Sequence, residues 1–237
     1  MFAVASSGDL AVNGDSVVGM RIVIAGGHGR IALDLEQLLT DRGDTPVGLI
    51  RHAGQADDLR QRGAEPVVLD LESSGVSEVA AVLGGADAVV FAAGAGPGSG
   101  AARKDTVDRA AAVLLADAAE RAGVPRYVMV SSMGADAAAP DGTDPVFGAY
   151  LRAKGAADDD LRARPGLEWT VLRPGSLTDA PPTGLVTLAE HTGRGSVPRG
   201  DVAAVLAALL TVPAPAAGRT LELVSGRQPI AAALTGS

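Results

Sequence analysis

Short apolar runs alternate with longer amphipathic segments along most of this chain of 237 residues. Runs of about five residues suit strands that are buried on both faces, and the longer segments have the spacing of helices. The predicted strands are Arg21–Ala25, Val47–Arg51, Pro66–Leu69, Ala88–Phe91, Arg126–Ser131 and Glu168–Arg173. This alternation predicts an α/β fold in which right-handed crossovers join parallel strands and helices cover both faces of one sheet.

The predicted helices lie at about 30–42, 54–62, 74–83, 101–122 and 146–164. Beyond Pro181-Pro182, a strand near 185–189, a helix near 201–211 and a strand near 220–224 follow. This last part of the chain is too short for a second domain with its own core. Residues 20–237 are therefore predicted to form one domain, with 181–237 as a small substrate-side lobe.

Residues 1–19 lack a basic start and a continuous apolar stretch, so they are not expected to be a secretory signal. They are expected to form a flexible extension or to precede the true start at Met20. No run approaches the roughly 18 apolar residues of a membrane span. Without cysteine the chain has no disulfide or thiolate site, which fits a reducing cytoplasm.

The composition argues against nucleic acid as a partner. The net charge is −8, whereas a nucleic-acid surface needs a basic face to neutralise phosphates. Three Phe, two Tyr and one Trp are too few for a base-stacking surface. The three histidines lack zinc-ligand spacing, so no metal site is expected. The expected partner is a small molecule, and the chain is equally compatible with a monomer or a homodimer.

A glycine-rich loop follows the first predicted strand and opens the first predicted helix, reading Gly26-Gly27-His28-Gly29-Arg30-Ile31-Ala32. Gly26 permits a tight turn, Gly29 lets backbone amides approach a diphosphate, and Ala32 allows close packing of helix on strand. The helix N-terminus attracts the anion, and Ile31 is included among the expected cofactor contacts. The loop thus predicts a dinucleotide-binding, Rossmann-type doubly wound parallel sheet. His28 is expected to line the phosphate approach rather than to act in catalysis.

The end of the second strand indicates which dinucleotide binds. An NAD site usually has Asp or Glu there, but this chain has Arg51, which can pair with a 2′-phosphate. Arg30 is expected to reach the same phosphate. NADP(H) is therefore favoured over NAD(H), although both arginines are also compatible with ordinary solvated side chains.

Residues at the ends of the third and fourth strands are expected to complete the cofactor site. Asp70 can accept a hydrogen bond from the adenine amino group, and Leu71 can cover the ring. Small residues would leave room for the adenine-side ribose at Ala92, Ala93 and Gly94.

Ser131 and Ser132 end the fifth strand, and Tyr150 and Lys154 follow at helical spacing. Residues four apart share one helix face, and a nearby ammonium favours the phenolate form of a tyrosine. Tyr150 is therefore a candidate general acid or base for a carbonyl or alcohol. A serine hydroxyl at this sheet edge is placed to hold a substrate oxygen, because ligands of doubly wound sheets bind there.

Over residues 20–226 the chain resembles the short-chain dehydrogenase/reductase superfamily, and in particular its atypical NAD(P)H-binding branch, related to NmrA-like and flavin/biliverdin-reductase-like proteins. The likeness rests on seven segments in order: Gly26–Ala32, Asp70-Leu71, Val107–Arg109, Arg126–Ser132, Tyr150–Lys154, Leu172–Gly175 and Arg199–Ala203. The resemblance implies that Lys154 holds the nicotinamide ribose and assists Tyr150. It also implies that Tyr150 transfers the proton, Ser132 orients the carbonyl and Pro174 borders the nicotinamide.

Three functions remain open at this point. The first is an NADP(H)-dependent oxidoreductase that reduces a small carbonyl or similar hydride acceptor. The second is a regulatory protein of the NmrA-like type that responds to the cofactor, since the only asparagine is Asn13 and the helical Asn of many relatives is missing. The third, a sugar-nucleotide epimerase or dehydratase, is disfavoured by the short C-terminal part. The loop Gly94–Gly100 is interpreted either as a cofactor lid or as a surface loop.

Overall fold

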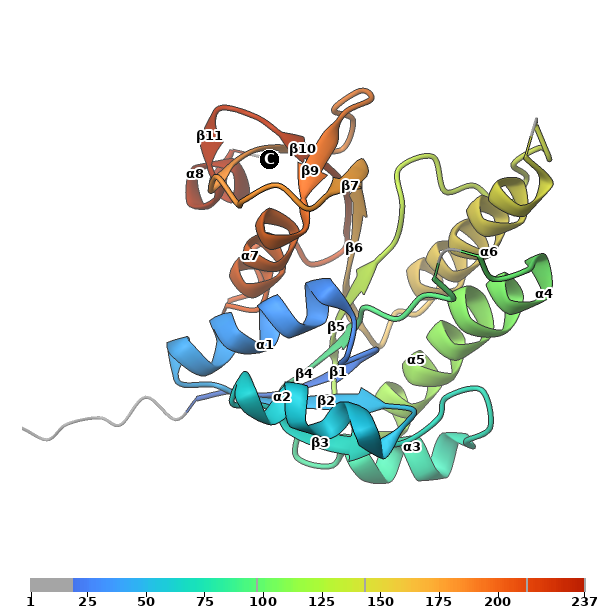
Figure 1. Cartoon of the computed structure of the whole chain (residues 1–237), viewed down its shortest axis with the longest axis vertical. Coiled ribbons are helices and arrows are strands. Elements are labelled where there is room, and N and C mark those ends of the chain that lie inside the picture. Colours follow the sequence, from blue (N-terminus) through green and yellow to red (C-terminus); the bar gives the residue numbers. More distant parts are fainter. Residues whose placement is uncertain (1–18, 97, 143, 212, 237) are drawn as a thin grey trace, which may run out of the picture.

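A nine-stranded sheet forms the centre of the molecule in the computed structural model, which describes residues 19–96, 98–142, 144–211 and 213–236 (Figure 1). Its strand order is β11-β8-β10-β6-β5-β4-β1-β2-β3. The strands are β1 (Arg21–Ala25), β2 (Thr45–Ile50), β3 (Glu65–Val68), β4 (Ala88–Phe91), β5 (Arg126–Val130), β6 (Glu168–Pro174), β8 (Leu185–Ala189), β10 (Arg219–Ser225) and β11 (Gln228–Pro229). All neighbours from β3 to β10 pair in parallel, which confirms the predicted doubly wound sheet.

Helices cover both faces of the sheet (Figure 1). The helices are α1 (Arg30–Arg42), α2 (Ala56–Gln61), α3 (Val76–Leu83), α4 (Ala101–Arg103), α5 (Ala111–Ala122), α6 (Pro145–Arg162), α7 (Arg199–Leu209) and α8 (Ile230–Thr235). A 3₁₀ turn, η1 (Ala53–Gln55), precedes α2, and a π-helical segment, η2 (Lys104–Ala110), joins α4 to α5. One hydrophobic cluster includes residues of α1, α7 and α8, and a second includes residues of α3, α5 and α6. Each face of the sheet therefore has its own buried core.

The predicted elements agree closely with the structure because their apolar runs are long enough to show a period. The predicted helix at 101–122 is continuous but contains the π-helical segment η2. Four elements were not predicted, namely β7 (Ser176–Thr178), β9 (Ser196–Pro198), β11 and α8. The strands among them have only two or three residues and therefore carry no periodic signal.

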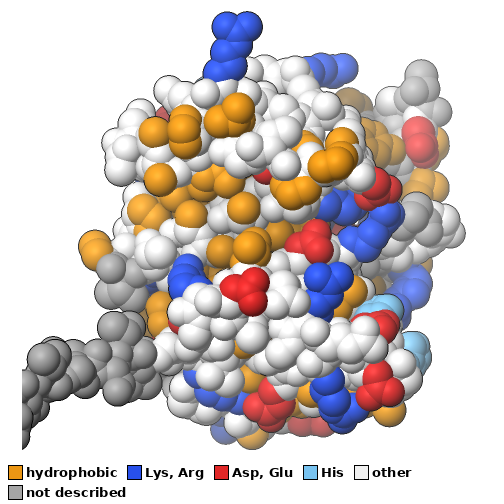
Figure 2. All heavy atoms as spheres, turned by 60° about the vertical axis from the view of Figure 1, so that its left-hand side comes forward, with side chains coloured by type: hydrophobic (Ala, Val, Ile, Leu, Met, Phe, Trp, Pro, Cys, Tyr) orange, Lys and Arg blue, Asp and Glu red, His pale blue; other side chains and the backbone are white. Residues whose placement is uncertain are grey.

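The part of the chain beyond Pro181 extends the main sheet. Strand β10 adds to it in parallel with β6, and β8 pairs with β10 antiparallel. Helix α7 packs against α1, while β7 and β9 form a separate two-stranded sheet. On the face shown in Figure 2, hydrophobic side chains gather over the upper half and charged ones over the lower half. No helix within the described ranges is long and apolar enough to cross a membrane. The predicted extension 1–19 lies, except for Gly19, outside the described residues.

Candidate functional site

The glycine loop connects β1 to α1 in a conformation that requires its glycines. Gly26 has a φ of +81°, and a Cβ there would lie 2.7 Å from the Cα of Ala93. The Gly29 amide donates to the carbonyl of Gly26 at 2.8 Å, and Gly29 caps α1 without any side-chain hydrogen bond. The backbone amides at this helix N-terminus therefore remain available to an anion. The loop fits the diphosphate of a dinucleotide.

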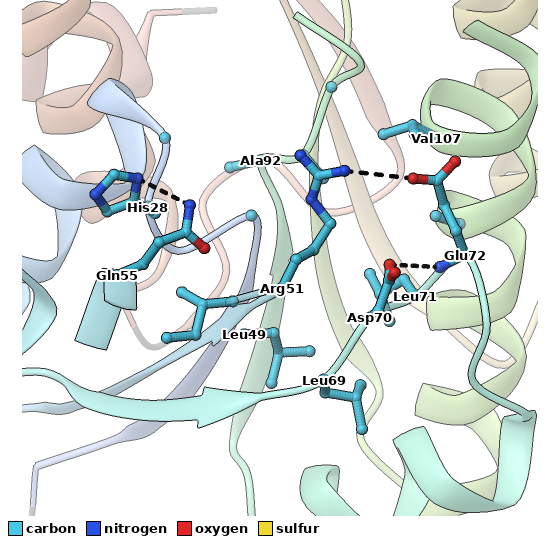
Figure 3. A pocket seen from close by; sticks show the side chains of 16 residues that line it. His28, Leu49, Arg51, Gln55, Leu69, Asp70, Leu71, Glu72, Ala92 and Val107 are labelled. Carbon is cyan, nitrogen blue, oxygen red and sulfur yellow. Dashed lines mark hydrogen bonds and ion pairs between the residues drawn. The ribbon is translucent and has the colours of Figure 1, made fainter. Parts of the chain in front are cut away.

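A cavity of about 270 Å³ lies beside the loop at the ends of β2, β3 and β4 (Figure 3). It brings together eight of the predicted cofactor residues: Gly26, Gly29, Arg51, Asp70, Leu71, Ala92, Ala93 and Gly94. His28 also lines it, with its ring between Asp58 and Gln55 at 2.7 and 3.1 Å. This cavity corresponds to the predicted adenosine end of the site.

Sequence reasoning missed Glu72, which is the charged partner of Arg51 in this cavity. Arg51 Nη1 lies 3.5 Å from Glu72 Oε2, as Figure 3 shows, and Arg103 Nη2 lies 2.6 Å from the same oxygen. The Thr106 hydroxyl donates to the other oxygen, and this hydrogen bond, followed by Arg103 and Arg51, lowers the pKa of Glu72. Its position two residues after Asp70 was the only sequence signal available.

Arg30 lies apart from Arg51 in the structure. Its guanidinium pairs with Asp179 at 2.7 Å, and both residues line a separate cavity of about 810 Å³ between α1 and α7. Arg199, the first residue of α7, pairs with the same carboxylate. Arg30 therefore does not join Arg51 in the adenosine-end cavity, because a carboxylate far along the chain holds it on the α7 side of α1.

A third cavity, of about 850 Å³, lies at the ends of β4, β5 and β6. The predicted catalytic residues Ser132, Tyr150 and Lys154 all line it, as do the predicted cofactor residues Ile31, Ser131 and Pro174. It shares Ala92, Ala93 and Gly94 with the adenosine-end cavity. The two cavities thus adjoin along one edge of the sheet, and we call the third one the reaction cavity.

Lys154 lies at the base of the reaction cavity and is almost completely buried, with 4 % of its surface exposed. Its ammonium donates to the carbonyls of Val130 and Ala93 at 3.0 and 3.4 Å and pairs with Asp108 at 3.4 Å. These bonds hold Lys154 against the ends of β4 and β5. Asp108 comes from η2 and was not predicted as a site residue.

Tyr150 has different neighbours. Its ring stacks on Phe147 with 5.9 Å between centroids, and the ammonium of Lys104 lies 5.2 Å from its centroid. The Ser132 hydroxyl donates to the carbonyl of Met133 at 3.3 Å. Phe147 is half exposed at the cavity wall, which gives the space around Tyr150 an aromatic side.

Ser131, a predicted cofactor contact, also has a partner within the protein. It borders the reaction cavity, but its hydroxyl donates to Asp158 Oδ2 at 2.9 Å. Arg173 Nη2 lies 2.7 Å from the same oxygen. Burial raises the pKa of Asp158, and the bonds from Ser131 and Arg173 oppose this rise. In this structure the Ser131 hydroxyl therefore belongs to a buried network with Asp158 and Arg173, and its contact with a cofactor stays a prediction.

Glu36 of α1 is a fully buried carboxyl behind the glycine loop. A Cβ on Gly48 would lie 2.5 Å from its Oε1, and one on Gly27 would lie 3.0 Å away. Within the described part of the chain, neither carboxyl oxygen has a hydrogen-bond partner. Burial raises the pKa of Glu36 to about 8, and the charge of Arg62 opposes the rise.

The raised pKa of Glu36 predicts that stability falls as the pH rises. The unfolded chain releases this proton near pH 4.5 and the folded chain near pH 8, so the contribution is full below 4.5 and lost progressively up to about 8. Between pH 5 and 8 the unmodified protein is expected to lose roughly 3 kcal/mol of its free energy of unfolding through Glu36. Glu36→Gln cannot ionise, so this part of the loss is expected to be absent in the variant. Urea denaturation of both proteins across this range measures the difference. Parallel pH profiles for the two would contradict the assignment.

The chain is similar to known proteins over most of its length. The NAD(P)H-binding family matches residues 26–213. The chain is 35 % identical to YhfK of Bacillus subtilis, described as an uncharacterized sugar epimerase, over 91 % of this chain and 99 % of that protein.

Two solved structures are similar throughout. A putative NAD-dependent epimerase/dehydratase from Bacillus halodurans is 36 % identical, with a TM-score of 0.85, covering 92 % of this chain and 100 % of the other. ChuY, an anaerobillin reductase from Escherichia coli O157:H7, is 27 % identical, with a TM-score of 0.72, covering 86 % and 97 %.

Proposed function

The chain belongs to the NAD(P)H-binding family of atypical short-chain dehydrogenases/reductases, and from this we propose that it is an NADPH-dependent reductase of a small carbonyl or similar hydride acceptor. The observation that carries the proposal is that Ser132, Tyr150 and Lys154 line one cavity that adjoins the glycine-loop cavity. A nearby hydride donor and a proton donor are what reduction of a carbonyl requires.

The residues present fit the cofactor. A Cβ at Gly26 would lie 2.7 Å from the Cα of Ala93 and one at Gly29 would lie 3.1 Å from the carbonyl oxygen of Gly26, so the cradle is tight. The start of α1, which has no side-chain cap, offers backbone amides to a diphosphate. Arg51, Asp70 and Leu71 would surround the adenosine end, and Pro174 would border the nicotinamide end. Bound NADPH would supply the hydride.

Three side chains would carry the proton chemistry. Tyr150 would give its hydroxyl proton to the substrate oxygen as the carbonyl carbon is reduced, so that an alcohol and a phenolate result. Ser132 would donate a hydrogen bond to the same oxygen and orient it. The Lys154 ammonium donates two of its three N–H groups to the carbonyls of Val130 and Ala93. The third N–H would donate a hydrogen bond to the cofactor ribose.

Arg51 supports NADPH as the preferred cofactor, because a guanidinium pairs strongly with a 2′-phosphate. Arg51→Ala is expected to weaken NADPH binding by about 10- to 100-fold, because it removes a charge-assisted hydrogen bond. NADH lacks the 2′-phosphate, so its binding is expected to weaken much less. Isothermal titration with each cofactor measures the ratio.

Arg30→Ala is the matched control, because Arg30 lies in the separate cavity with Asp179. Both cofactors carry the same diphosphate, so any effect of Arg30→Ala on diphosphate binding would be equal for both. The ratio of the NADPH affinity to the NADH affinity would therefore stay unaltered. Equal affinity of the unmodified protein for NADPH and NADH would remove the argument for a 2′-phosphate site.

Turnover is tested by following NADPH absorbance with a panel of carbonyls, quinones and flavins. The aromatic wall formed by Tyr150 and Phe147 supports a planar, conjugated acceptor. Oxidation of NADPH that depends on one member of this panel is the expected result. Tight cofactor binding without any turnover would instead support the cofactor-responsive regulatory protein.

An epimerase is a second candidate, because two relatives at 35 and 36 % identity carry that word in their descriptions. An epimerase reduces its own oxidised intermediate, so it would interconvert a sugar without net consumption of cofactor. Product analysis of nucleotide sugars incubated with the NAD-loaded protein distinguishes it from a reductase.

A further inference from the structure

We propose that Lys104, rather than Lys154, is the positioning residue that orients Tyr150 and stabilises its phenolate. The inference refines the proposed reductase, since it concerns the proton donor of that same site. It rests on four features of the structure: the position of the Lys104 ammonium, its lack of a counter-charge, the separate engagement of Lys154 and the π-helical turn at Lys104.

The ammonium of Lys104 lies against the ring of Tyr150. Its Nζ is 5.2 Å from the ring centroid, within the range of a cation–π contact, and it donates to the carbonyl of Gly96 at 2.9 Å. Only 9 % of Lys104 is exposed, and the residue lines the reaction cavity. A largely buried positive charge is therefore held against the ring that carries the proposed donor hydroxyl.

Lys104 has no carboxylate partner. Among the residues that the structure describes, no carboxylate oxygen lies within ion-pair distance of its ammonium. A buried ammonium without a counter-charge is costly, and one carbonyl and one aromatic face offset that cost only in part. Formation of a phenolate on Tyr150 would supply the missing negative charge.

Lys154 is engaged elsewhere. Its ammonium donates hydrogen bonds to Val130 and Ala93, forms an ion pair with Asp108 at 3.4 Å, and lies 5.4 Å from the ring centroid of Phe91. The two duties that the family resemblance assigns to one lysine are thus divided. Lys154 is fixed where the cofactor ribose would lie, and Lys104 is the ammonium in contact with Tyr150.

Lys104 also begins the π-helical segment η2, which interrupts an otherwise regular helix. Such π turns cost helical stability and are frequent at functional sites. Through Gly96, Lys104 further ties the glycine-rich loop 94–100 to Tyr150. The same π-helical segment contains Asp108, the ion-pair partner of Lys154. This segment therefore supplies both Lys104 and the counter-charge of Lys154.

The other charged groups around the cavity are accounted for. Asp108 pairs with Lys154, Asp144 caps α6 through bonds to Val146 and Phe147, and Arg199 pairs with Asp179. Arg194 lines the wall formed by the segment between β8 and β9. Among these described charged groups, Lys104 is the one whose charge contacts the Tyr150 ring.

The chain permits a direct test, because Tyr127 and Tyr150 are its only tyrosines. Burial raises the pKa of the Tyr127 hydroxyl, so tyrosinate absorbance at 295 nm reports Tyr150 while the protein is folded. In Lys104→Met the absorbance is expected to rise at a pH about one unit higher than in the unmodified protein. Lys104→Arg, which keeps the charge, is expected to restore the original profile.

Lys104→Gln separates charge from hydrogen bonding, since it keeps a donor for Gly96 but loses the charge, and it is expected to shift like Lys104→Met. Circular dichroism confirms that each variant is folded at each pH. An unchanged tyrosinate profile in folded Lys104→Met or Lys104→Gln would overturn the role of Lys104. If the profile shifts but no acceptor is reduced, the inference about Lys104 holds and the proposed reductase fails.

Discussion

Tyr150→Phe is expected to lower turnover of the acceptor by about 10²- to 10⁴-fold, the usual value of a positioned proton donor. The ring is retained, so its stacking on Phe147 and its contact with Lys104 remain available. NADPH binding is expected to stay unchanged, because only the hydroxyl is lost. Single-turnover oxidation of NADPH measures the step directly.

Tyr127→Phe is the matched control for this change. Tyr127 is fully buried, and its hydroxyl donates to the carbonyl of Ala112 at 3.2 Å, away from both cavities. Loss of the Tyr127 hydroxyl is expected to lower the free energy of unfolding by about 1 kcal/mol and to leave turnover of the acceptor unchanged. If Tyr150→Phe and Tyr127→Phe reduce the acceptor equally fast, Tyr150 is not the proton donor.

Arg173→Met is expected to destabilise the fold by about 3 to 5 kcal/mol, because it leaves the buried Asp158 carboxylate without its counter-charge. Arg173 Nε and Nη2 lie 2.9 and 2.7 Å from Asp158 Oδ2. Urea denaturation at pH 8 measures the loss. The loss is expected to shrink at acidic pH, since Arg173 favours the ionised form of Asp158 and a protonated Asp158 does not need it.

A second substitution separates the ion pair from the packing of Arg173. Arg173→Met combined with Asp158→Asn removes both charges, and it is expected to recover a large part of the lost stability. If the double variant is no more stable than Arg173→Met alone, the loss comes from packing. The strand end that carries Ser132 depends on this ion pair through Ser131, so cofactor binding is expected to weaken together with stability.

The fold could be read largely from local patterns. The bounds of β1 and β4 were predicted to the residue, and the approximate ranges predicted for β8 and α1 coincide with these elements. Each of them carries a clear period or a glycine stop such as Gly43. The π-helical turn at Lys104 could not be predicted, because its residues are ordinary helix formers and only the tertiary packing selects the wider turn.

Most of the predicted site residues line the two adjoining cavities, but the directions of several polar side chains could not be predicted. Strand order brings Arg51, Tyr150 and Lys154 to one sheet edge, and the sequence predicted the doubly wound parallel sheet that has such an edge. The direction of a polar side chain depends on partners distant in the chain, as Asp179 redirects Arg30 and Asp158 takes the hydroxyl of Ser131.

By itself, the sequence determined the doubly wound sheet, the glycine loop and the set of residues at its edge, because periodicity and glycine geometry are local properties of the chain. Only the tertiary structure decided how the charges are paired. It buried Lys154 with Asp108 and left Lys104 beside Tyr150, because a buried charge takes its partner from whichever element packs against it.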